Sequence, residues 1–420
     1  MAKWSDIDAS GLHPESLMMT YGYRPEWSEG AAAPPIFQNS TFVFPSAAVG
    51  ERCFAVAYGL AAPLPDEHPD LIYSRINNPD LEIAEDRLAL WDRAETAALF
   101  VSGMAAITTT LWAHLRPGDV IAASSPIYGG THHFIETVLP QFGIESVRFD
   151  PDAKAGDVIA MVEATGRPLG MVYAETPANP TNALIDLGMC AEVAARFSTP
   201  ARRVPVAVDN TFLGPVFQRP LEHGADIVLY SATKYLGGHG DLIAGAAVGA
   251  KALLDPIRVM RTFTGNMLTP FVSWLLMRSL ATLHLRMERQ ADNAQKVADF
   301  LRGHAKVESV NYLGHLESGD PGHDLYRKQC LGPGGMISFE VAGGKPEAYR
   351  FLDGLRLFKL AVSLGSVDSL AEHPATMTHC EAGKEANDAK GITESLIRMS
   401  IGVEHPDDLV ADVKQALEAI

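Results

Sequence analysis

The 420-residue sequence predicts an α/β fold, with a mostly parallel sheet in a large domain and a smaller C-terminal domain of α+β type. From about residue 71 to residue 249, short apolar runs alternate with longer helical stretches. This alternation is typical of a parallel sheet that is covered by helices on both faces. Beyond residue 303, strand-like runs at 336–343 and 395–402 mix with helical stretches, which predicts the second domain.

The elements of the large domain follow from the same pattern. Helical stretches at 105–115 and 130–139 lie between apolar runs that are short enough to be strands. A longer helical pattern from Pro270 to about Gly303 leads from this domain into the C-terminal one. The strand-like runs cover residues 97–101, 119–124, 170–175, 204–209 and 226–231.

The first 66 residues read as irregular, because several prolines interrupt any regular pattern there. We expect this segment to be an extended N-terminal arm that contacts a neighbouring subunit. The predicted organisation is therefore an arm over residues 1–66, a large domain over 67–265 and a C-terminal domain over 266–420. The interrupting prolines are Pro34, Pro35, Pro45, Pro63 and Pro65.

The composition excludes several classes of protein. A formal net charge of −17 disfavours binding to nucleic acid or to anionic membranes. No apolar run is long enough to span a bilayer, and the N-terminus lacks the apolar core of a signal peptide. The four cysteines form no CxxC motif, which predicts reduced thiols and a cytoplasmic location. The 14 histidines show no metal-ligand spacing, so we expect no metal site.

A lysine marks the end of the last predicted strand of the large domain. Lys234 lies beyond Ser231 and Thr233, and a glycine-rich loop follows it. A lysine held as a neutral amine is a Schiff-base nucleophile. Neighbouring hydroxyls and a flexible loop suit a bound phosphate. An amine beside a phosphate site predicts pyridoxal phosphate (PLP), although a lysine exposed on a loop is the simpler alternative.

Three other strand ends carry groups that would complete such a site. Ligands of open parallel sheets bind beyond the carboxyl ends of the strands. Ser102-Gly103-Met104 open a helix whose N–H groups can hold a phosphate, or Ser102 is only an N-cap. Asp209, followed closely by Thr211, can pair with a pyridinium nitrogen, or it too is an N-cap. Asn179 can hydrogen-bond the ligand, or it only shapes a proline-rich turn.

Several motifs along the chain resemble the PLP-dependent transsulfuration family of cysteine and methionine metabolism. This family includes methionine γ-lyase, cystathionine lyases, cystathionine γ-synthase and O-acetylhomoserine sulfhydrylase. The resemblance implies the fold-type I architecture of PLP-dependent transferases and a homotetramer made of two active dimers. The matching motifs are YSRINNP (73–79), SGMAA (102–106), YGGT (128–131), ETPANPT (175–181), VDNTF (208–212), SATKYLGGHGD (231–241), SLGS (363–366), HPATMTH (373–379) and RMSIG (398–402).

The resemblance also implies a role for each matching residue. Lys234 would carry PLP as an imine and move protons, and Asp209 would pair with the ring nitrogen. Tyr128 would stack on the ring and protonate the leaving group. The remaining residues form three groups. Ser102, Gly103, Met104, Thr211, Ser231 and Thr233 would line the cofactor and its phosphate; Tyr73 and Arg75 would reach that phosphate from the neighbouring subunit; Asn179, Ser363 and Arg398 would hold the substrate carboxylate, with Val362 beside them.

The predicted reaction is γ-elimination from methionine or a similar γ-substituted L-amino acid, giving a 2-oxo acid and ammonia. The alternative is γ-replacement, as in cystathionine γ-synthases and acyl-homoserine sulfhydrylases. An apolar Val362 resembles the methionine γ-lyases and sulfhydrylases, whereas Gly130 departs from the cysteine of the methionine γ-lyase pattern. Residues 50–71 look like an insertion near the partner's site. Other classes, a PLP-independent Schiff-base enzyme, a metalloenzyme or a non-catalytic regulator, account for fewer of these residues.

Overall fold

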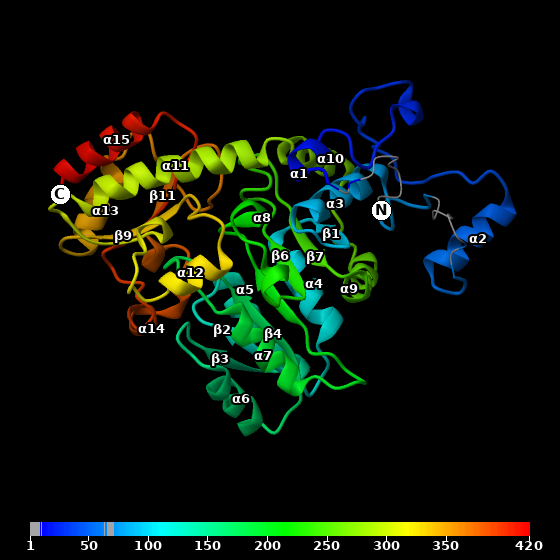
Figure 1. Cartoon of the computed structure of the whole chain (residues 1–420), viewed down its shortest axis with the longest axis horizontal. Coiled ribbons are helices and arrows are strands. Elements are labelled where there is room, and N and C mark those ends of the chain that lie inside the picture. Colours follow the sequence, from blue (N-terminus) through cyan, green and yellow to red (C-terminus); the bar gives the residue numbers. More distant parts are fainter. Residues whose placement is uncertain (1–8, 10, 63, 65–70) are drawn as a thin grey trace.

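The computed structural model of the chain describes residues 9, 11–62, 64 and 71–420. Parts of the predicted arm and of the predicted insertion, residues 1–8, 10, 63 and 65–70, lie outside this described part. Two sheets organise the rest (Figure 1). The larger sheet lies within the first two thirds of the chain, and the smaller one belongs to the C-terminal third.

The larger sheet has seven strands in the order β1-β7-β6-β5-β4-β2-β3. Only β7 runs antiparallel to its neighbours, so the sheet is mostly parallel, as predicted. The sequence analysis found five of these strands and missed β3 and β7. Their bounds are β1 Thr96–Phe100, β2 Val120–Ser124, β3 Glu145–Phe149, β4 Leu169–Glu175, β5 Val206–Asp209, β6 Ile227–Tyr230 and β7 Gly245–Gly249.

Helices cover both faces of this sheet, because successive residues of each strand point to opposite faces and apolar residues lie on both. On one face, Met171 and Tyr173 of β4 pack in a core with α4 and α9. On the other face, Val172 and Ala174 pack against α6 and α7 at one end, and α3 and α10 cover the other end. The helices of this domain are α3 Pro79–Trp91, α4 Gly103–His114, α5 Gly129–His133, α6 Ala155–Ala164, α7 Leu187–Phe197, α8 Gly214–Phe217 and α9 Lys251–Thr264.

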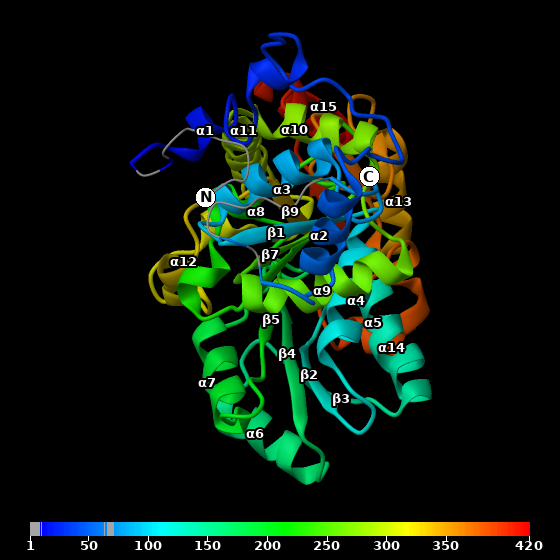
Figure 2. The same ribbon diagram turned by 90° about the vertical axis from the view of Figure 1, so that its right-hand side faces the viewer.

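The predicted long helix after Pro270 is two helices in the structure, α10 Pro270–Leu280 and α11 Leu283–Arg302. The helical conformation is interrupted at Ala281-Thr282, where a turn separates α10 from α11. The first half of α11 packs in the core of the large sheet through Leu283 and Met287, and the second half packs against the C-terminal sheet through Val297 and Leu301. This helix therefore links the two cores, and Figure 1 shows it running from the large domain into the C-terminal one. Figure 2, turned by 90°, shows α6 and α7 on one side of β4 and α4 on the other.

The C-terminal sheet has five strands in the order β10-β11-β12-β9-β8. Two of its three inner strands, β9 and β12, are the two strand-like runs that the sequence predicted. Helices α11, α13 and α15 pack on one side of it. The bounds are β8 Val307–Asn311, β9 Met336–Val341, β10 Lys359–Leu360, β11 Leu370–Glu372, β12 Leu396–Ser400, α12 His323–Gln329, α13 Lys345–Gly354, α14 Lys384–Asp388 and α15 Pro406–Glu418.

The prediction that residues 1–66 are irregular is wrong at two helices, α1 and α2. After a short helix α1 (Pro14–Leu17), the segment packs into the core of the large sheet, where Met18 and Tyr21 are buried. An eleven-residue helix, α2 (Ala47–Ala57), follows Pro45. The Ser46 hydroxyl caps it by accepting from the Val49 N–H, and proline before a helix does not prevent the helix from forming. Figure 1 shows α2 standing away from both sheets.

Candidate active site

Lys234 follows β6 in a turn, at the edge of the sheet where the parallel strands end. Its Nζ donates a hydrogen bond to the Ser363 hydroxyl, 2.6 Å away. Burial, together with the nearby Arg398 charge, lowers the pKa of Lys234 to about 8, although Glu372 opposes this shift. The large domain thus presents to the C-terminal domain an amine that is easily deprotonated.

Ser363 connects this amine to a buried guanidinium. Its φ of 94° is in the left-handed region, which a serine rarely adopts, and such strain is often found at functional sites. Its carbonyl accepts from Arg398 Nη2 at 2.8 Å. Arg398 Nη1 also donates to Asn179 Oδ1 at 2.9 Å. The three predicted carboxylate-binding residues therefore meet beside Lys234, and Arg398 is only 3% exposed.

Asp209 and Thr211 join the ends of two strands. The Asp209 carboxylate accepts from the backbone N–H of Thr211 at 3.0 Å and from its hydroxyl. Thr211 Oγ1 in turn accepts from the Ser231 N–H at 2.9 Å. Burial raises the pKa of Asp209, and these hydroxyl and N–H donors oppose the shift.

The start of α4 lies directly against this cluster. A Cβ placed on Gly103 would lie 2.8 Å from the Ser231 Cβ, so only glycine permits this close approach. Ser102 caps the helix, since its hydroxyl accepts from the Ala105 N–H at 3.0 Å. The N–H groups of Gly103 and Met104 precede the first intrahelical hydrogen bonds, as an anion site at a helix N-terminus requires. Thr233 contributes by fixing the loop, because its hydroxyl bonds both polar backbone atoms of Ala244.

Tyr128 lies at the N-terminus of α5, and its backbone N–H donates to Glu175 Oε2 at 2.7 Å. Its ring lies over Gly130, where a Cβ would be 2.7 Å from the tyrosine Cε1 and 3.2 Å from the Met104 sulfur. A larger residue at position 130 would force the ring to move. Glycine at position 130, where the methionine γ-lyase pattern has cysteine, thus leaves room for the observed position of the Tyr128 ring.

Two predicted site residues lie apart from this cluster within the chain. Arg75 Nη1 donates to the carbonyl of Thr262 in α9 at 2.8 Å, and its guanidinium lies 5.7 Å from the centre of the Tyr73 ring. Tyr73 is 40% exposed. Val362, the neighbour of Ser363, is 55% exposed and lies on the open side of the site.

Sequence reasoning assigned no role to two buried carboxylates of the site. Glu175 accepts from the N–H groups of both Tyr128 and Asn179, and burial together with the neighbouring Asp209 raises its pKa to about 8. Its position at the end of an apolar strand was a usable signal. Glu372 pairs with Arg398, with 2.7 Å between Oε1 and Nη1. No local pattern marks Glu372, because strand pairing alone brings it there.

The residues present fit PLP, because the charge of Asp209 is left without a cationic partner among them. A buried carboxylate needs a cationic partner, yet no cationic side chain within the described residues forms an ion pair with Asp209. The pyridinium of PLP would supply that partner, with its phosphate at the α4 N-terminus and its aldehyde near Lys234. A fold with helices on both faces of a mostly parallel sheet, an amine at a strand end, an anion cradle and a buried aspartate together define a PLP-dependent enzyme.

Comparison with known proteins supports this class of enzyme and identifies the family within it. The chain belongs to the Cys/Met metabolism PLP-dependent enzyme family, whose model matches residues 15–418. It is 42% identical over 401 residues to the L-methionine gamma-lyase of Pseudomonas putida, which covers 95% of this chain and 96% of that protein. It is 40% identical over 411 residues to the cystathionine gamma-lyase of Bacillus subtilis, covering 97% of this chain and 100% of that one.

A solved structure confirms the fold. The cystathionine gamma synthase of Xanthomonas oryzae pv. oryzae has a TM-score of 0.86 and 33% identity, and the match covers 98% of this chain and 99% of that one. The predicted fold-type I architecture and PLP as the cofactor are therefore correct. In the described part of the chain, no helix has both the length and the apolar character for crossing a membrane. No three acidic, histidine or cysteine side chains gather there as metal ligands would.

Proposed function

We propose that the protein is a γ-elimination lyase that acts on methionine or a similar γ-substituted L-amino acid, releasing a 2-oxo acid, ammonia and the leaving group. The observation that carries this proposal is full-length similarity, at 42% and 41% identity, to the L-methionine gamma-lyases of Pseudomonas putida and Fusobacterium nucleatum subsp. polymorphum. The apolar Val362 beside the carboxylate site agrees with a substrate that has an uncharged side chain.

The geometry supports an α-amino acid as substrate. Ser363 touches both the Lys234 amine and the Arg398 guanidinium, so a substrate carboxylate at Arg398 has its α-carbon within reach of the lysine. A guanidinium suits a carboxylate because it donates two parallel hydrogen bonds. Bound PLP supplies the electron sink that makes the α-proton acidic.

Protein groups then carry the protons. In this proposal Lys234 would accept the α-proton. Loss of a second proton, from Cβ, would supply the electron pair that expels the γ-substituent, and water would complete the release of ammonia and the 2-oxo acid. Asp209 keeps the ring nitrogen protonated. The Tyr128 hydroxyl donates a proton to the departing group, and its backbone N–H is fixed by Glu175. Asn179 and Arg398 hold the carboxylate still, so that the α-C–H bond keeps its orientation to the lysine.

The alternative function is γ-replacement, and the likeness to a cystathionine gamma synthase structure favours it as the second candidate. One assay separates the two. Purified enzyme is incubated with methionine, and separately with O-acetylhomoserine or O-succinylhomoserine together with cysteine or sulfide. We expect 2-oxobutanoate and a thiol from methionine. Formation of a thioether amino acid without any 2-oxobutanoate would overturn the elimination proposal.

We also propose that the enzyme works in the cytoplasm as a homo-oligomer whose active sites are shared between subunits, with a dimer of dimers expected. Tyr73 and Arg75 support this, since both side chains are exposed and Arg75 bonds the Thr262 carbonyl of α9 instead of a residue of the site. In the proposal they reach the phosphate site of a neighbouring subunit. Sedimentation equilibrium tests it, and a monomer that retains full activity would contradict it.

A further inference from the structure

Glu372 lies directly opposite Arg398 in the C-terminal sheet. The two residues are paired in the antiparallel register of β11 and β12, so their side chains share one face of the sheet. Both side chains are buried, at 0% and 3% exposure. The ion pair is therefore built into the strand pairing and faces the site that holds Asn179 and Ser363.

A hydroxyl fixes the orientation of this carboxylate. Thr378 Oγ1 donates to Glu372 Oε1 at 2.9 Å, the same oxygen that accepts from Arg398. His379 Nδ1 lies 2.9 Å from that hydroxyl, so a second hydrogen bond fixes the Thr378 side chain. Burial keeps the pKa of His379 low, at about 4, so the histidine is neutral and adds no charge. Burial raises the pKa of Glu372, but the Arg398 guanidinium and the Thr378 hydroxyl favour its charged form, and they hold the carboxylate in one orientation.

Within the described part of the chain, Glu372 is also the one charged acceptor among the partners of Arg398. Its other acceptors, Asn179 Oδ1 and the Ser363 carbonyl, are neutral. A substrate carboxylate that docks on Arg398 therefore shares the guanidinium with a resident carboxylate. Glu372 further offsets the effect of Arg398 on the Lys234 ammonium, since the two charges act on that amine in opposite directions.

From this geometry we propose that Glu372 is a positioning residue for the substrate carboxylate: it holds the Nη1 end of Arg398 in place and balances the charge around Lys234. The inference rests on the proposed amino-acid substrate but not on which γ-substituent leaves. It predicts that the two parts of the role, position and charge, separate in two different variants.

The experiment compares Glu372→Gln and Glu372→Ala in the PLP-loaded enzyme. Glutamine keeps an acceptor for Arg398 and for Thr378 but loses the charge, whereas alanine loses both. Glu340→Gln is the matched control, because Glu340 lies in the adjacent strand β9 and bonds the hydroxyls of Ser309 and Thr393 instead. The probe is L-norleucine, which has the length of methionine but no leaving group at Cγ. Its dissociation constant is read from the absorbance of the bound cofactor, as is the pH midpoint of the PLP–lysine link.

We expect Glu372→Ala to bind norleucine about tenfold more weakly, because Arg398 loses its anchor, a change of ~1.4 kcal/mol. Glu372→Gln should bind it no more weakly than the native enzyme and should shift the pH midpoint downward by about half a unit, since a charge that favours the ammonium is gone. The control should match the native enzyme in both. An unchanged midpoint in Glu372→Gln together with unchanged norleucine binding in Glu372→Ala would overturn the inference. Failure to turn over methionine would overturn only the proposed function.

Discussion

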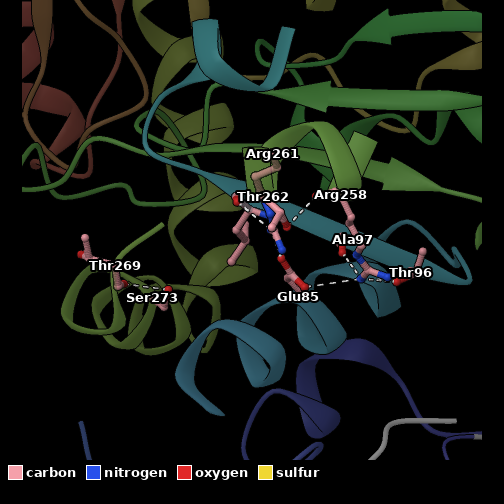
Figure 3. A network of polar contacts seen from close by, with 9 residues as sticks. Glu85, Thr96, Ala97, Arg258, Arg261, Thr262, Thr269 and Ser273 are labelled. Carbon is pink, nitrogen blue, oxygen red and sulfur yellow. Dashed lines mark hydrogen bonds and ion pairs between the residues drawn. The ribbon is translucent and has the colours of Figure 1, made fainter. Parts of the chain in front are cut away.

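The molecule contains two buried carboxylate–arginine groups that differ in how fully the carboxylate is used. Figure 3 shows the first, in the large domain, where Glu85 of α3 meets Arg258 and Arg261 of α9. Its Oε1 accepts from the Leu99 N–H of β1 at 2.8 Å and from Arg261, and Oε2 lies 3.4 Å from Arg258. The second is the Glu372–Arg398 pair of the site. There, Oε2 of Glu372 has no hydrogen-bond partner among the described residues, although it is buried.

This difference separates a structural group from a functional one. The Glu85 carboxylate is satisfied at both oxygens and ties together two helices and a strand, so it leaves nothing for a ligand. Among the residues described, Oε2 of the Glu372 carboxylate has no partner, and its arginine also bonds residues from two other segments, Asn179 and Ser363. Unsatisfied buried polar groups are costly, and they are tolerated where function requires them. Variants at the two sites should therefore fail in opposite ways.

The largest expected effect comes from replacing the site lysine. Lys234→Ala should lower the turnover of methionine by at least about 10⁴-fold, or ~5.5 kcal/mol, because it removes the amine that would bind PLP covalently and move the α-proton. Its thermal midpoint should not fall, since burial already disfavours the lysine charge. Steady-state kinetics and calorimetry measure the two quantities. A variant that works at full speed would remove the basis of the proposed function.

The opposite failure is expected from Glu85. Glu85→Ala leaves Arg261 buried without its partner, which should cost about 3–5 kcal/mol in the free energy of unfolding. The KM of the protein that remains folded should stay within twofold of the native value. Urea unfolding measures the loss. The control is Glu222→Ala, which removes ion pairs near the surface with Arg93 and Arg219 and should cost less than about 1 kcal/mol. An equal loss in the free energy of unfolding for Glu85→Ala and Glu222→Ala would contradict the structural role of Glu85.

Local sequence patterns were enough to predict the residues at the strand ends, because β1, β5 and β6 are apolar runs that are followed by polar or small residues. Lys234, Asp209 and Gly103 were found in this way and do come together. The break between α10 and α11 and the helix α2 were missed, since tertiary packing and a single capping serine decided them. Glu372 was out of reach for a different reason, because its partner Arg398 is brought to it only by the pairing of β11 with β12.

A smaller effect is expected at the exposed edge of the site. Val362→Glu should raise the preference for cystathionine over methionine, measured as a ratio of kcat/KM, by about tenfold, or ~1.4 kcal/mol. The new carboxylate would attract the second ammonium of cystathionine, which methionine lacks. Val362→Leu keeps an apolar side chain and should leave the ratio within twofold. A glutamate variant with an unchanged ratio would mean that Val362 lies outside the path of the substrate side chain.

The smallest effect concerns how the cofactor-free protein takes up PLP. The nucleophile is the neutral amine, and a Lys234 pKa of about 8 leaves roughly a tenth of it neutral at pH 7 and nearly all of it above pH 9. The rate of covalent PLP uptake, followed by absorbance, should therefore rise about tenfold between these values and then level off. An ordinary lysine would keep gaining rate up to about pH 10. If the rate does not level off, the surroundings of Lys234 do not lower its pKa. The charge of Lys234 would then be fully compensated, as the charge of the Glu85 carboxylate is.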